Sequence, residues 1–211
     1  MAEQRAGARR GSPFLAWKRT SLRARGQRLP PGQVLAKGWP VLTYEPEVPA
    51  VDRSTWRLRV FGRVERPLEL SWEELMALPS STVEVDVHCV TRWSKLGMRW
   101  AGVRVSAVAA RAGVLDDASH ALAHSVTGYA ANLTRDDLDQ DASLLAFQVD
   151  GEPLAPEHGG PIRLFVPHLY LWKSVKWLAG LEFLDHDRPG YWEQRGYHNR
   201  GRPWPEERYS T

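Results

Sequence analysis

The sequence has a single cysteine, Cys89, among its 211 residues. One thiol cannot form an internal disulfide, and no group of cysteines and histidines has the short spacing of a zinc site. No apolar run is long enough to span a bilayer, so we expect no membrane partner. These absences exclude a disulfide scaffold and a zinc finger, and leave the role of Cys89 to be explained.

Acidic residues are nearly missing from the N-terminal region. Residues 1–40 carry nine Lys or Arg against one acid, which leaves nineteen against twenty-four in the remainder. We expect residues 1–33 to form a basic flexible arm and residues 34–211 to form one folded domain. The arm has the charge to bind nucleic acid, but no nucleic-acid motif accompanies it, so we expect a solvated tail and no such partner. No apolar segment follows Arg9 and Arg10 as an export signal requires, which predicts a cytoplasmic protein.

Long regular helices are not expected, because tryptophan and proline are abundant. The chain has ten Trp and fifteen Pro, with 43% hydrophobic and 25% charged residues. This composition is typical of a soluble α+β domain with mixed sheets, short helices and many ordered loops. Strands are predicted at residues 56–62, 82–89, 121–126, 143–149, 162–166 and 181–184, and helices at residues 71–78, 103–112 and 134–138.

The strand phase gives Cys89 a direction. In Thr82–Cys89 the valines alternate with charged and polar residues, and the cysteine falls in phase with the valines. The thiol is therefore predicted to point inward at the end of a strand. Three roles are open: a buried structural thiol, which composition alone favours, a nucleophile with a histidine base, or a metal ligand. The histidines considered as a base are His88, His124, His158 and His168.

A second group of residues has the chemistry of a phosphate site. It combines cations, a hydroxyl and two glycines, which together suit a phosphate because fixed N–H donors and cationic side chains share its charge. Spacing alone would favour a solvated charged turn, and neither Walker-A nor dinucleotide glycine spacing is present. The residues are His158, Gly159, Gly160, Pro161, Arg163, Lys173, Ser174 and Lys176.

Taken together, these segments resemble the family of sulfite oxidases and protein-methionine-sulfoxide reductase catalytic subunits, which share an oxidoreductase molybdopterin-binding domain. The similarity runs from about Val41 to Tyr197. The segments that resemble the molybdenum-binding cysteine region are Val87–Ser94 and Trp100–Val103. Those that resemble the pterin-binding region are Gly151–Leu154, His158–Leu164 and Ser174–Trp177.

The resemblance implies a cofactor and a reaction. Cys89 would bind molybdenum, with one molybdenum and one molybdopterin per chain. The reaction implied is oxygen-atom transfer, as sulfite oxidation or as reduction of an S- or N-oxide. The residues implied in cofactor binding are His158, Arg163, Ser174, Val175, Lys176 and, in a looser match, Ser125.

The resemblance leaves the substrate open between an oxyanion and an S- or N-oxide. Tyr129 matches the family's substrate-side tyrosine. Where the family has an asparagine and a substrate-binding arginine, this sequence has Leu42–Glu45. Sulfite is a dianion that needs several cations to offset its desolvation. Arg92 is the predicted catalytic cation, with His168 and Lys95 as further candidates.

The length of the sequence shapes two further expectations. It has no room after the molybdenum domain for a haem module or an immunoglobulin-like dimerisation domain, so we expect a monomer with a separate electron-transfer partner. Two alternatives remain at this point: a cysteine-dependent hydrolase or transferase, and a non-catalytic anion-binding module.

Overall fold

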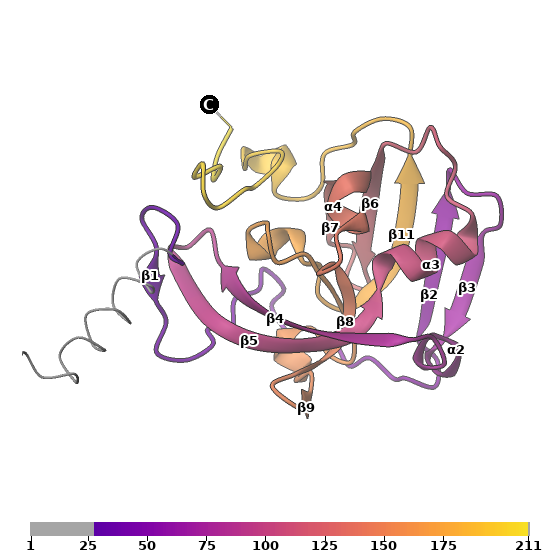
Figure 1. Ribbon diagram of the computed structural model, residues 1–211, viewed down its shortest axis with the longest axis horizontal. Coiled ribbons are helices and arrows are strands. Elements are labelled where there is room, and N and C mark those ends of the chain that lie inside the picture. The colour runs from indigo at the N-terminus through magenta and orange to yellow at the C-terminus, as the bar shows by residue number, and fades with distance from the viewer. Residues whose placement is uncertain (1–27, 211) are drawn as a thin grey trace, which may run out of the picture.

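The computed structural model describes residues 28–210, and two mixed β-sheets form its frame (Figure 1). The predicted basic arm lies mostly outside the described residues, as do Arg9 and Arg10. The first sheet contains β1 (Val34–Leu35), β4 (Ser80–His88), β5 (Trp93–Arg104), β8 (Leu144–Val149), β9 (Glu152–Pro153) and β10 (Arg163–Phe165). The second contains, in spatial order, β3 (Leu68–Ser71), β2 (Arg57–Gly62), β11 (Leu178–Leu184), β6 (His120–Ser125) and β7 (Ala130–Thr134).

The helices are short, as the sequence predicts, and the α+β class is confirmed. The α-helices are α2 (Trp72–Met76), α3 (Val105–Ala112) and α4 (Arg135–Asp139), and the 3-10 helices are η1 (Pro156–His158), η2 (Leu171–Lys173) and η3 (Glu193–Arg195). Capping boxes begin α2 at Ser71 and α4 at Thr134, because each cap side chain accepts from the N3 amide. None of the helices in residues 28–210 has the length and apolar character that crossing a bilayer requires.

Strand β5 is the longest strand that the sequence did not predict, and the shorter β1, β3, β7 and β9 were not predicted either. It pairs with β4 on one side and with β8 on the other, and its burial pattern does not alternate. Register shifts interrupt both pairings, so a period of two residues is not visible in the sequence. The helix predicted at 103–112 starts at Val105 instead, because its first two residues still belong to β5.

Two hydrophobic clusters fill the interior. The larger one joins the second sheet to α3, through residues such as Leu58, Val108 and Leu181. The smaller one surrounds the end of β4 and includes Cys89 and Trp100. The thiol thus lies at the edge of a packed apolar layer, which restricts its motion.

The predicted boundary of the folded domain is wrong for residues 28–33. Gln33 is buried, and its Nε2 donates to the carbonyl of Cys89 at 3.0 Å. Arg28 forms an ion pair with Asp86 on β4. These residues are part of the domain because they pack against the strand that carries the cysteine.

Candidate functional site

A cavity of about 290 Å³ lies beside the turn that follows β4. Segments distant in sequence converge on it: the 39–45 segment, the turn after β4, the η1–β10 and η2 regions, and the C-terminal tail. The side chains that line it include Trp39, Tyr44, Glu45, Cys89, Tyr129, His158, Arg163, Trp172, Ser174, Lys176, Trp192 and Tyr197.

Cys89 presents its thiol to this cavity. The residue is only 8% exposed and belongs to the same hydrophobic cluster as Val87, which confirms the inward direction predicted from strand phase. Thr91 Oγ1 donates to Sγ at 3.2 Å, and Arg92 N donates to the Cys89 carbonyl at 3.1 Å, which closes a tight turn. Burial raises the pKa of the thiol. A cation or metal ion at the cavity would therefore be needed to hold it as a thiolate.

The structure does not pair Cys89 with a base. No histidine in residues 28–210 hydrogen-bonds to its sulfur. His88 Nδ1 lies 2.8 Å from Ser94 Oγ instead. His158 lines the same cavity, but its ring stacks on Trp39 with 3.5 Å between centroids. A cysteine nucleophile needs a base within hydrogen-bond reach, and this geometry does not supply one.

A buried arginine and a half-buried lysine form one wall of the cavity. Arg163 is 3% exposed and donates to the carbonyls of His158 at 2.8 Å and Ser174 at 2.6 Å. Lys176 Nζ donates to two other carbonyls, at 2.7 and 2.8 Å. Among the described residues neither cation has an ion pair. Buried charge without a counter-ion is costly, so this wall is built to receive an anion.

The pKa values of the wall reflect the same excess of positive charge. Burial lowers the pKa of Arg163 to about 10 and that of Lys176 to about 8. For Lys176 the charge of Arg163 adds to burial. Burial, together with these two cations, lowers the pKa of His158 to about 4, so that the ring is neutral near pH 7. An anion in the cavity would relieve this repulsion.

Two glycines allow the wall to pack closely. Gly159 has a φ of +100°, and a Cβ there would lie 2.9 Å from Lys176 Cβ. A Cβ at Gly160 would lie 2.0 Å from the carbonyl oxygen of Leu154. The sequence predicts that these glycines allow a close backbone approach, and the structure confirms that a Cβ would clash at both positions.

The rest of the cavity lining is largely aromatic and carries one carboxylate. Tyr129 is buried and donates its hydroxyl to the carbonyl of Trp172 at 2.6 Å, and Tyr44 packs beside it. Glu45 is half-buried, and its carboxylate accepts from Thr127 Oγ1 at 2.8 Å. The only cationic or histidine side chains that line the cavity in residues 28–210 belong to the wall described above. This part of the lining, which we call the mouth, is therefore aromatic and apolar with one carboxylate.

Two of the cations proposed for substrate binding lie outside the cavity. Arg92 has a φ of +70° within the turn after Cys89, and its exposed side chain points to Gly32, where a Cβ would lie 2.9 Å from Nη1. Lys95 lies on β5 and does not line the cavity. The structure therefore does not bring the predicted catalytic Arg92 to the site.

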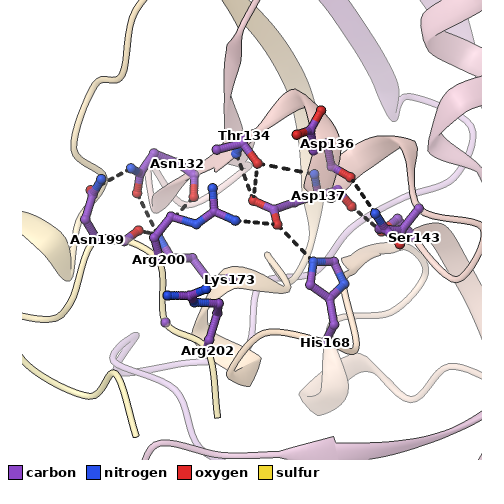
Figure 2. A network of polar contacts seen from close by, with 12 residues as sticks. Asn132, Thr134, Asp136, Asp137, Ser143, His168, Lys173, Asn199, Arg200 and Arg202 are labelled. Carbon is purple, nitrogen blue, oxygen red and sulfur yellow. Dashed lines mark hydrogen bonds and ion pairs between the residues drawn. The ribbon is translucent and has the colours of Figure 1, made fainter. Parts of the chain in front are cut away.

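A polar network that does not line the cavity contains two further predicted residues (Figure 2). His168 Nε2 lies 2.9 Å from the carboxylate of Asp137, which also accepts from Arg200 at 3.0 Å. Lys173 is buried and donates to both the carbonyl and the side-chain oxygen of Asn132. Neither His168 nor Lys173 lines the cavity, so grouping Lys173 with the phosphate cations is wrong.

Two predicted cofactor contacts lie just behind the lining. Ser125 is buried, and its Oγ lies 3.1 Å from Thr127 Oγ1, which in turn binds Glu45. Val175 is a core residue whose carbonyl accepts from Leu164 on β10. Ser174 does line the cavity, although its Oγ already accepts from a backbone amide at 2.9 Å.

Sequence reasoning missed several residues of the site. Trp39 and Trp172 gave no signal because aromatic residues are spread along the whole chain. Glu45 was visible only as a departure from the family pattern. Gln33 and Arg208 contact the cysteine turn from the two ends of the domain, and only the fold places them there.

The model of the oxidoreductase molybdopterin-binding domain matches residues 45–192. The chain belongs to this family. It is 45% identical over 184 residues to the uncharacterized oxidoreductase YuiH of Bacillus subtilis, with 87% of this chain and 92% of that protein covered. It is 29% identical to mouse mitochondrial sulfite oxidase, over 80% of this chain and 37% of the relative. It is 27% identical to the protein-methionine-sulfoxide reductase catalytic subunit MsrP of Gluconobacter oxydans, over 66% of this chain and 50% of that protein.

The fold agrees with this family. The sulfane dehydrogenase SoxCD of Paracoccus pantotrophus matches with a TM-score of 0.63 and 24% identity, over 74% of this chain and 46% of that one. The chain thus spans half or less of the sulfite oxidase, MsrP and SoxCD chains, but nearly all of YuiH. It is a molybdopterin-dependent oxidoreductase of the sulfite-oxidase type.

The residues present fit the cofactor. The wall of Arg163 and Lys176 has no ion-pair partner within residues 28–210 and suits the phosphate of a molybdopterin. Neutral His158 offers a ring nitrogen for hydrogen bonding to the pterin. Cys89 presents a soft sulfur ligand to the same cavity, which suits a metal that cycles between oxidation states.

Proposed function

We propose that this domain catalyses oxygen-atom transfer with an uncharged S- or N-oxide as substrate. The observation that carries this proposal is the split of charge in the cavity. Its cations lie in the wall that suits the cofactor phosphate, whereas the mouth carries aromatic rings and the carboxylate of Glu45. An anionic substrate such as sulfite would meet a negative charge there in a partly buried environment.

Each residue of the cavity has a part in holding the cofactor or the substrate. Cys89 would bind the molybdenum, and Arg163, Lys176 and Ser174 would bind the pterin phosphate. One molybdenum and one molybdopterin per chain are expected, since the chain has one cysteine and one such wall. When bound, the cofactor supplies a metal centre that cycles by two electrons. In the proposed direction, S-oxide, two electrons and two protons give sulfide and water.

The aromatic mouth would position the substrate and limit water. Tyr129 cannot turn freely because its hydroxyl is held by the carbonyl of Trp172, and burial raises the pKa of this tyrosine well above its usual value. It therefore stays neutral near pH 7 and cannot act as a base. Its ring lines the cavity, where it would contact the substrate.

A substrate comparison on metal-loaded protein tests this proposal. The wild type should reduce methyl phenyl sulfoxide or trimethylamine N-oxide, with reduced viologen as electron donor, at a higher kcat/KM than it oxidises sulfite. Efficient sulfite oxidation without S- or N-oxide reduction would contradict the proposed substrate class. A protein that binds molybdopterin but transfers oxygen in neither direction would contradict oxygen-atom transfer itself.

The role of Glu45 gives a sharper version of this test. Glu45→Gln should raise kcat/KM for sulfite severalfold, because one repulsive charge contact in a partly buried site is worth roughly 1 kcal/mol. Reduction of a neutral sulfoxide should change little. Glu47→Gln provides a control in the same segment, because Glu47 is exposed and does not line the cavity. If the ratio of kcat/KM for sulfite to that for the sulfoxide is unchanged in Glu45→Gln, the proposed charge repulsion is wrong.

The cellular setting is a further part of the proposal. We propose a cytoplasmic monomer that exchanges electrons with a separate protein, as the sequence leads us to expect. The relatives named as sulfite oxidase and methionine-sulfoxide reductase support a redox partner of this kind. Sedimentation of the purified protein tests the monomeric state, and fractionation of the source cells tests the cytoplasmic location.

A further inference from the structure

Two side chains from opposite ends of the domain hold the backbone of the cysteine turn. Gln33 Nε2 donates to the carbonyl of Cys89 at 3.0 Å. Arg208 Nη1 donates to the next carbonyl, that of Val90, at 2.5 Å. The successive peptide units that carry the thiol are thus each bound by a side chain from outside the turn.

Arg208 is a buried cation whose one ion-pair partner in the described part of the chain is a solvent-exposed carboxylate. Its side chain is 6% exposed, and the carboxylate of Glu206, at 3.6 Å, is 43% exposed and therefore screened by solvent. Its Nε is buried and has no hydrogen-bond partner among residues 28–210. A guanidinium in this state is costly unless a negative charge lies nearby. Cys89, one residue from the bound carbonyl, would supply that charge as a metal-bound thiolate.

The surroundings of Arg208 fix its position. Its guanidinium lies over the ring of Tyr170, 5.0 Å from the centroid, and Nη2 donates to the carbonyl of Pro31 at 3.4 Å. The backbone on either side is held as well, because His198 N donates to the Arg208 carbonyl and Tyr197 bridges to Tyr209. The charge is therefore presented to the cysteine turn by a packed segment.

We propose that Gln33 and Arg208 are positioning residues for the metal-binding thiolate: together they fix the Cys89 turn from behind, and the charge of Arg208 stabilises the reduced metal site. The inference rests on Cys89 binding the metal, and not on which substrate reacts. A fixed positive charge favours the more negative, reduced state. Removal of the charge should therefore lower the midpoint potential of the metal.

The test uses full-length protein loaded with cofactor, in the variants Arg208→Met, Arg208→Lys and Gln33→Met. The control is Arg202→Met, in the same tail, whose exposed side chain pairs with Glu207. Molybdenum content, melting temperature, the electron paramagnetic resonance signal of the half-reduced metal and the midpoint potential are measured for each protein.

The proposal predicts different results for the four variants. Arg208→Met should retain metal, with a changed resonance signal and a lower midpoint potential. Arg208→Lys should recover most of the potential, which a purely structural role would not predict. Gln33→Met should change the signal with a smaller effect on the potential, and Arg202→Met should match the wild type.

A signal and a potential equal to those of the wild type in Arg208→Met would overturn the proposal. If Arg208→Met fails to fold, Gln33→Met decides the question, and a signal and a potential equal to those of the wild type in Gln33→Met would overturn the proposal. Wild-type protein without molybdenum would instead overturn the metal role of Cys89, so the two failures are distinguishable.

Discussion

The charge of Lys176 depends on its surroundings in the cavity. Burial and the neighbouring Arg163 lower its pKa to about 8 in the cofactor-free protein. Below that pH the ammonium is present to bind phosphate, and above it the charge is lost. Uptake of molybdopterin by the cofactor-free protein should therefore weaken as the pH rises through about 8.

Replacing Lys176 checks this assignment. Lys176→Ala should lose a charged hydrogen bond worth about 1.5–3 kcal/mol, so that pterin content after dialysis falls and no longer depends on pH near 8. Lys95→Ala is a matched control because Lys95 lies outside the cavity. Unchanged pterin retention in Lys176→Ala would argue against a phosphate at this wall.

Single residues differ in how far the sequence could place them. Cys89 was placed correctly because strand alternation defines a direction, and β4 keeps that direction to its end. Arg92 was misplaced, because a left-handed residue in the following turn sends its side chain away from the cavity. Such a conformation is not encoded by alternation, and non-glycine residues seldom adopt it.

At the scale of elements, Asp137 joins α4 to His168 and to Arg200 in the C-terminal tail (Figure 2). Burial alone would raise the pKa of Asp137, but hydrogen bonds from His168 and Thr134 outweigh it and hold the pKa at about 2. Because this pKa is below the ordinary value of 3.8, the ionised carboxylate stabilises the fold above pH 4. That contribution, about 2 kcal/mol, is lost as the pH falls toward 2.

Asp137→Asn should therefore reduce the free energy of unfolding near pH 7 and flatten its dependence on pH between 4 and 2. Urea unfolding at several pH values measures both effects. Asp136→Asn serves as the control, since Asp136 is exposed on the same helix. An acid dependence equal to that of the wild type in Asp137→Asn would contradict the role of this network.

The connection from η1 to β10 gives a second prediction at this scale. Gly160→Ala places a Cβ against the carbonyl oxygen of Leu154, so the loop must shift, at a cost of about 1–3 kcal/mol. Because Arg163 follows in the same segment, cofactor content should fall together with the melting temperature. Gly38→Ala, where a Cβ meets nothing within 4 Å, should leave both unchanged. A fully loaded and stable Gly160→Ala would show that the loop tolerates the change.

The sequence predicted elements with clear local patterns better than elements defined by their partners. The capping boxes of α2 and α4 are local, and both helices were found. Strand β5 is paired on both sides by β4 and β8, so its burial follows from contacts distant in sequence. Its residues were therefore interpreted only as part of a family segment.

At the scale of the whole molecule, the site exists only because the two sheets bring distant segments together. The family segments account for Cys89 and for the cation wall, since each is contiguous in sequence. The acidic, aromatic mouth and the contacts of Gln33 and Arg208 depend on the packing of the N-terminal segment and the tail against the domain. Local patterns carry no information about such contacts, so the sequence could not predict them.

The central claim is that Cys89 and the Arg163–Lys176 wall hold one molybdenum and one molybdopterin. Metal and pterin analysis of wild-type protein and Cys89→Ser, both purified from a molybdopterin-competent host, tests it most directly. We predict about one of each per chain in the wild type. Cys89→Ser should keep its fold and its pterin, because the cation wall is intact, but lose molybdenum or bind it without oxygen-transfer activity. A wild-type protein that contains neither molybdenum nor pterin would contradict the account.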